Sequence, residues 1–142
     1  TGTAGSTGAA GTTGADGGAV ISFATDVWTP IIMNKCKPCH TTNSDAGLSM
    51  KDAATGYKSL VGTTMGVAAM NDLMCTMLSA AKKRVVPGDP DHSYLWIKVN
   101  GTDASLAGPK CGIAMPKAGS NLTLTAAEKT TIHDWIMSGA KP

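Results

Sequence analysis

Residues 36–40 read Cys36-Lys37-Pro38-Cys39-His40, a C-x-x-C-H pattern in the first third of the chain. Two thiols at this spacing can each form a thioether with one vinyl group of a haem, and the adjacent imidazole can bind the iron. This pattern is typical of c-type haem attachment. We therefore expect Cys36 and Cys39 to anchor one covalent haem c, with His40 as the proximal iron ligand.

Two other chemistries use the same cysteine spacing. A dithiol redox motif usually sits beside a βαβ pattern, and the sequence shows none. A structural zinc site needs a second pair of ligands, but Cys75 and Cys111 stand 36 residues apart and form no such pair. Haem attachment is therefore favoured, and the other two chemistries stay open as minor alternatives.

The composition fits one small domain. With 142 residues the chain is long enough for a single core, yet it holds one Phe, two Tyr and three Trp. A haem would supply the large apolar body that so few aromatic residues cannot. The net charge of +2 gives no argument for nucleic-acid binding. No run of about 18 apolar residues predicts a membrane span.

Two cysteines remain after haem attachment, Cys75 and Cys111. C-type haem is attached outside the bacterial cytoplasm, where disulfides persist, so we expect these two to pair. Two separate buried thiols are the alternative. Because the chain starts in a polar segment with no signal peptide, we expect a mature exported product, placed in the periplasm, at the outer surface or outside the cell.

Residues 1–19 differ in composition from the rest of the chain. They are almost entirely Gly, Thr, Ala and Ser, which cannot bury a core, and they predict a flexible leader. Residues 20–142 then form the haem domain. Tethers of this kind often follow a lipid-modified cysteine, so lipid anchoring upstream of the leader is a hypothesis.

Periodicity and capping signals predict an all-α domain of several short helices with long loops, allowing one minimal two-stranded piece. The predicted helices cover residues 30–37, 52–60, 68–83, 89–101 and 125–139. A short strand is predicted at 48–50, an extended piece at 85–88, and a long loop at 102–119.

Met115 is the preferred distal iron ligand. It lies in the predicted long loop, and Pro116 stiffens the backbone after it. A Cys75–Cys111 bond would hold the same loop four residues earlier. A His/Met pair is the ligation of electron-transfer haems. The other candidates are His92, His133, Met50, Met65 and an open position. For three further methionines the helical spacing instead predicts packing in the core. These are Met70, Met74 and Met77.

Further side chains are candidates for the surroundings of the haem. The candidates for an apolar shell are Leu95, Trp96, Ile132 and Trp135, and a role in the protein core alone would also explain these four. The predicted partners of the haem propionates are Arg84 with Tyr94 or Trp96. The lysines on either side of the ligand segments are Lys35, Lys37, Lys110 and Lys117. They would steer an acidic redox partner toward the haem, and the equal alternative is that they are ordinary solvated lysines.

Taken together, these motifs resemble the class I c-type cytochromes, and within them the planctomycete-type bacterial monohaem cytochrome c domain. The resemblance spans residues 23–140. Besides Cys36-Lys37-Pro38-Cys39-His40, it rests on short motifs in the family's order: Asp26-Val27, Pro30-Ile31, Gly47-Leu48-Ser49-Met50, Val86-Pro87-Gly88-Asp89-Pro90, Met115-Pro116, Leu124-Thr125 and Trp135-Ile136. The pair Cys75 and Cys111 and the stretch 63–81 depart from the family pattern.

The resemblance implies a fold in which the first and last helices cross near one haem edge. It also implies thioethers at Cys36 and Cys39 and axial ligation by His40 and Met115. The implied activity is one-electron transfer between redox partner proteins, not enzymatic catalysis, by a free carrier or a subunit of a larger assembly. A labile distal site would instead indicate a haem-based gas sensor or a peroxidase-like enzyme.

Overall fold

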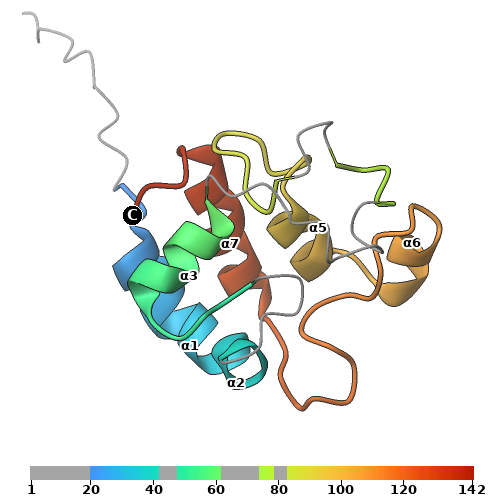
Figure 1. Ribbon diagram of the computed structural model, residues 1–142, viewed down its shortest axis with the longest axis horizontal. Coiled ribbons are helices and arrows are strands. Elements are labelled where there is room, and N and C mark those ends of the chain that lie inside the picture. Colours follow the sequence, from blue (N-terminus) through green and yellow to red (C-terminus); the bar gives the residue numbers. More distant parts are fainter. Residues whose placement is uncertain (1–19, 42–47, 62–73, 79–82) are drawn as a thin grey trace, which may run out of the picture.

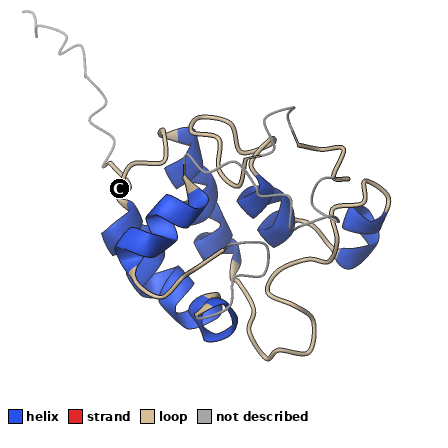
Figure 2. Cartoon of the chain, viewed as in Figure 1, coloured by secondary structure: helices blue, strands red, loops and turns tan. Residues whose placement is uncertain are grey.

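The computed structural model describes residues 20–41, 48–61, 74–78 and 83–142. Over these ranges the chain consists of helices joined by loops (Figures 1 and 2), and isolated bridges between described residues join Val61 to Val85 and Val86 to Asp89. The helices are η1 (Phe23–Ile32), α1 (Met33–Lys35), α2 (Lys37–His40), α3 (Ala53–Leu60), α5 (Tyr94–Asn100), α6 (Asp103–Ala107) and α7 (Ala126–Met137). The leader lies outside the described residues.

The first helix begins earlier than the sequence predicted. We expected a start at Pro30 with Thr29 as N-cap, but η1 begins at Phe23 after Ser22 and contains Pro30. Its wide π-type turns join residues five apart. The hydroxyl of Thr29 donates to the carbonyl of Ala24 at 2.9 Å. This side-chain bond lies in the turn that precedes the proline.

The segment after the Cys-His motif is held by a cap and by one backbone bond. Asp52 caps α3 as predicted, since its Oδ1 accepts from the backbone N–H of Thr55 at 2.8 Å. The strand predicted at residues 48–50 is wrong. Instead, the N–H of Met50 donates to the carbonyl of His40 at 2.8 Å, which ties this segment to the end of α2.

Helix α5 begins at Tyr94 and not at Pro90. Residues 89–93 form a turn in which the hydroxyl of Ser93 donates to the carbonyl of Asp89 at 2.7 Å. The N–H of Ser93 donates to the carbonyl of Pro90 at 2.9 Å. The aspartate and proline therefore make a turn here, and Ser93 becomes the N-cap residue.

Helix α6 lies inside the stretch that we predicted to be a long loop. Thr102 and Ser105 close its start reciprocally: the Thr102 Oγ1 accepts from the Ser105 N–H, and the Ser105 Oγ accepts from the Thr102 N–H. Serine replaces the usual Glu or Gln of a capping box. That replacement explains why the sequence signal was weak.

The helix predicted at residues 68–83 falls mostly outside the described residues, as does Met70. Residues 74–78 are described and are not helical. Met74 and Met77 are 55% and 42% exposed, so the predicted core role of these two side chains is wrong.

The last helix follows the prediction closely. Thr125 and Glu128 form a capping box at the start of α7, and Gly139, at φ +99°, ends it. Helix α7 packs against η1 through Trp135 and Phe23, whose ring centroids lie 5.2 Å apart. The main core contains the buried side chains Phe23, Val27, Trp28, Ile31, Ile32, Met50, Leu60, Val85, Val99, Ile132, Trp135 and Ile136.

A second, smaller core surrounds a disulfide. The sulfur atoms of Cys75 and Cys111 are 1.96 Å apart, so the structure joins the two cysteines as the sequence predicted. Both are completely buried, together with Leu78, Tyr94, Ile97 and Leu106. Among the described helices, none has the length and apolarity that a membrane span requires.

Candidate functional site

The four residues that the sequence singled out line one cavity. Cys36, Cys39 and His40 come from one turn near α2, whereas Met115 comes from a loop 75 residues later, and all four face a cavity of about 340 Å³. This volume lies in the range of small-molecule and cofactor sites. The fold therefore brings a distant methionine to the Cys-His motif.

The backbone of residues 36–40 explains how the motif presents its side chains. The N–H groups of Cys39 and His40 both donate to the carbonyl of Cys36 at 3.1 Å, which makes one tight helical turn. Pro38 stands in the first turn of α2, where its missing donor costs nothing. Because residues three apart share a helix face, both thiols project from the same side of this turn.

The protonation of Cys36 differs from that of a redox dithiol. Burial raises the pKa of its thiol to about 12, and the nearby Cys39 and Glu128 add to the shift. The reactive cysteine of a thioredoxin-type motif has a lowered pKa instead. This environment does not favour the dithiol alternative.

The lining of the cavity is mainly apolar, with cationic groups among its polar members. The apolar residues are Leu48, Met50, Leu60, Leu95, Val99, Pro116 and Leu122. The cationic residues are Lys35, Arg84, Lys98 and Lys117, and the uncharged polar ones include Tyr94 and Ser120. No Asp or Glu belongs to the described lining. Such a cavity suits an apolar body with acidic groups at its edge.

Arg84 is the most deeply buried of these cations. It is 5% exposed, and its Nη1 donates to the carbonyl of Ser59 at 2.7 Å. A guanidinium stays charged even when buried, so Arg84 brings a permanent positive charge to the cavity wall. Tyr94, the other predicted propionate partner at the cavity, lies beside it in the lining, but Trp96 does not line the cavity.

The predicted apolar shell needs correction. Leu95 lines the cavity, but Ile132 and Trp135 belong to the main core, and Trp96 packs against the ring of His133. The sequence analysis missed several lining residues: Leu48, Leu60, Lys98, Val99 and Leu122. For two of them a signal existed, since Lys98 and Val99 lie one helical turn after Tyr94 and Leu95 and therefore share their faces.

The rival iron ligands separate clearly. His92 and His133 lie outside the cavity, where their Nδ1 atoms meet Asp89 at 2.7 Å and Asp134 at 2.8 Å. Met65 lies outside the described residues. Met50 is 2% exposed and, like Met115, lines the cavity. Met115 and Met50 are therefore the two predicted distal candidates that the described structure brings to the site.

The four flanking lysines have different surroundings. Lys35 and Lys117 line the cavity. The Nζ of Lys37 lies 6.0 Å from the ring centroid of Trp28, a cation–π arrangement, and Lys37 is not part of the cavity lining. Lys110 is exposed. Two of the four thus stand where a partner approaching the cavity would meet them.

Comparisons of the chain with protein-family models, curated proteins and solved structures gave no match. Over the described residues, no three or more His, Cys, Asp or Glu side chains group together as a metal site. The cavity and its lining therefore carry the functional conclusion.

Proposed function

We propose that this protein is a monohaem c-type cytochrome of class I that passes single electrons between redox proteins outside the cytoplasm. The observation that carries the proposal is the convergence of Cys36, Cys39, His40 and Met115 on one largely apolar cavity. Two anchoring thiols, an imidazole and a thioether are the donor set that a His/Met-ligated haem c requires.

Each of these side chains has one role in the proposal. Cys36 and Cys39 would hold the cofactor covalently, and His40 and Met115 would ligate its iron. A haem bound there supplies an Fe(III)/Fe(II) couple. The leucines and Val99 of the lining would exclude water from this cofactor. A thioether ligand and an apolar environment both favour the less charged ferrous state. We therefore expect a relatively high reduction potential.

The cations of the lining have a matching role. Arg84, Lys98 and Tyr94 line the cavity, and the described lining offers no carboxylate to repel an acidic group. Charge-assisted hydrogen bonds to carboxylates are stronger than neutral ones. Arg84 is the best candidate to bind a haem propionate, because the Nζ of Lys98 and the hydroxyl of Tyr94 both donate to the carbonyl of Cys111.

The first experiment is the absorption spectrum of the purified protein, oxidised, then reduced, then exposed to CO. We expect a covalent haem, a weak near-infrared band from the methionine-sulfur bond to ferric iron, and no rapid reaction of the ferrous form with CO. A high-spin ferric spectrum or rapid CO binding would contradict Met ligation. The gas-sensor or peroxidase-like reading would then replace electron transfer.

A pair of variants names the ligand, because Met115 and Met50 line the same cavity. Met115→Ala should abolish the near-infrared band and admit CO, since it removes the distal thioether. Met50→Ala should keep the band and lose stability by about 2–5 kcal/mol, as expected for a buried methionine. The reverse pattern would move the distal ligand to Met50.

The partner is the second part of the proposal. Lys117 lines the cavity and stands two residues after Met115, so its charge would attract an acidic redox protein toward the cavity. Lys117→Glu should slow electron exchange with such a partner at low salt, and the difference from wild type should shrink at high salt. Lys129→Glu, on α7 and outside the cavity lining, is the matched control. If Lys117→Glu and Lys129→Glu slowed electron exchange equally, the effect of Lys117 would come from the net charge of the protein and not from its position at the cavity.

The compartment follows from the same chemistry. Covalent haem attachment and the Cys75–Cys111 bond both suit an oxidising, exported location. There the domain would act in one of three arrangements. It would be a free carrier, a subunit of a larger electron-transfer assembly, or a carrier tethered to the membrane by a lipid anchor upstream of residues 1–19. Size-exclusion of the native protein from a membrane-free extract distinguishes the free carrier from the other two arrangements.

A further inference from the structure

We propose that Lys98 is a positioning residue for Met115, because it holds both ends of the segment 111–115. The inference rests on the proposed function, in which Met115 is the distal ligand. Methionine sulfur is a weak ligand for iron, so the backbone that carries it has to be kept in place. Lys98 lies on α5, a helix that contributes several side chains to the cavity wall.

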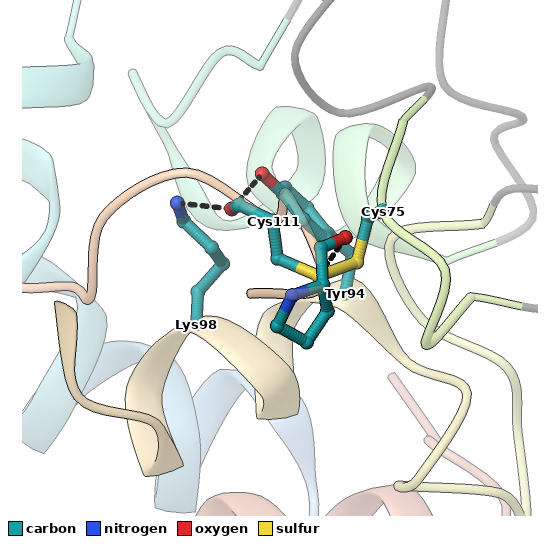
Figure 3. The surroundings of a disulfide bond; sticks show 5 residues. Cys75, Tyr94, Lys98 and Cys111 are labelled. Atoms are coloured by element: carbon teal, nitrogen blue, oxygen red, sulfur yellow. Dashed lines mark hydrogen bonds between the residues drawn. A yellow bond between two sulfur atoms is a disulfide. The ribbon is translucent and has the colours of Figure 1, made fainter. Parts of the chain in front are cut away.

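The two bonds of Lys98 come from different parts of the residue. Its backbone carbonyl accepts from the N–H of Met115 at 2.8 Å. Its Nζ donates to the carbonyl of Cys111 at 2.9 Å. The first bond uses an α5 carbonyl near the end of the helix. The second uses the side chain and is drawn in Figure 3. One residue therefore holds the backbone at both ends of the segment 111–115.

Tyr94 reinforces the grip at Cys111. It precedes Lys98 by one helical turn, and its hydroxyl donates to the same Cys111 carbonyl at 3.0 Å. The Nζ of Lys98 lies 5.4 Å from the centroid of the tyrosine ring. Figure 3 shows both donors meeting at this carbonyl. Because a carbonyl oxygen has two lone pairs, the two bonds can coexist.

Cys111 is itself fixed from the opposite direction. Its sulfur bonds to Cys75, its N–H donates to the carbonyl of Leu106 at 2.9 Å, and both cysteines are 0% exposed. The small core therefore provides a rigid point. Lys98 connects that point to Met115.

The glycine after Cys111 supplies an independent observation. Gly112 has a φ of +77°, a conformation that favours glycine, and a Cβ added there would lie 3.0 Å from the Nζ of Lys98. The loop thus leaves the space that the ammonium group occupies. An alanine at this position would strain the backbone and press against the same contact.

The test measures how firmly Met115 is held in the haem-loaded, ferrous protein. Lys98→Met keeps most of the aliphatic stem and removes the ammonium. We expect CO to enter about 10- to 100-fold faster than in wild type, the range that corresponds to one charged hydrogen bond. The near-infrared band of the ferric form should weaken. Tyr94→Phe should act in the same direction with a smaller effect, and Lys98→Arg, which keeps a cationic donor, should restore part of the band.

The control is Lys110→Met, which removes a lysine charge next to Cys111 at an exposed position. It should leave the rate of CO entry and the band unchanged. Thermal unfolding of each variant shows whether a spectral change accompanies general destabilisation. A Lys98→Met variant with wild-type CO kinetics would overturn the inference while leaving Met115 ligation intact. Rapid CO binding by the wild type would overturn the proposed function instead.

Discussion

Gly56 lies directly against the indole of Trp28, and this contact sets how closely α3 approaches η1. A Cβ added at Gly56 would lie 2.7 Å from Cζ3 of Trp28, and the indole is 6% exposed, so it has little room to move away. Glycine is needed here for space, not for an unusual backbone angle.

We therefore expect Gly56→Ala to destabilise the protein by about 1–3 kcal/mol through overpacking. Gly108→Ala is the matched control, since a Cβ at Gly108 meets nothing within 4 Å. Urea unfolding followed by tryptophan fluorescence measures both variants. If the two alanines proved equally harmless, the close approach of α3 to η1 would be wrong.

The N-cap of α3 makes the stability of this element depend on pH. Hydrogen bonds from the backbone and the hydroxyl of Thr55 lower the pKa of Asp52 below its ordinary value of 3.8. A lowered pKa in the folded state means that the ionised cap stabilises the fold above the unfolded-state pKa. That contribution is lost as the pH falls below about 4 and through the folded-state pKa.

Asp52→Asn tests this because asparagine still caps a helix but does not titrate. Unfolding free energies measured from pH 5 to pH 2 should fall more steeply for wild type than for the variant. Parallel curves over this range would show that the Asp52 cap contributes no pH dependence.

Local signals predicted some elements well. Asp52 and the box of Thr125 with Glu128 fixed the starts of α3 and α7, because a cap is satisfied by residues within one turn. The Cys-His motif likewise needs five consecutive residues. Met115 was chosen from its loop and from Pro116, and the structure brings it to the cavity.

Other features depend on contacts that are distant in sequence. Pro30 normally ends a helix, yet η1 continues through it and packs against α7. The sequence predicts a strand at residues 48–50, but a hydrogen bond from the N–H of Met50 to the carbonyl of His40 holds them in a loop. Trp135 was predicted beside the haem because it is large and apolar, and the packing of α7 on η1 assigns it to the core. Such choices follow from packing, which the pattern of one segment does not contain.

At the scale of the whole molecule, the cavity lies between two cores. Met50, Leu60 and Val99 belong to the main core, whereas Tyr94 belongs to the small core around the disulfide. The Cys75–Cys111 bond closes a loop with a sequence separation of 36 residues. This bond therefore constrains a part of the chain that follows the Cys-His motif in sequence and that contributes Tyr94 to the cavity wall.

We expect the double variant Cys75→Ser/Cys111→Ser to lose up to about 4 kcal/mol of stability, from the chain entropy of a loop of this size. Denaturant unfolding measures the loss. Wild type treated with a strong reductant under unfolding conditions is the companion measurement, since it opens the same loop without changing the sequence. A loss well below 1 kcal/mol in both would mean that the small core holds together without its covalent link.

The two ends of the described domain meet at one place (Figure 1). The hydroxyl of Ser22 donates to the carbonyl of Pro142 at 2.9 Å, and the N–H of Phe23 donates to that of Lys141 at 3.1 Å. From there η1 and α1 run roughly 15–20 Å to Cys36. A label or an electrode coupled at Ser22 or at Pro142 would consequently hold the domain by the same side, with a similar spacing to His40, so these two positions are equivalent handles for oriented immobilisation.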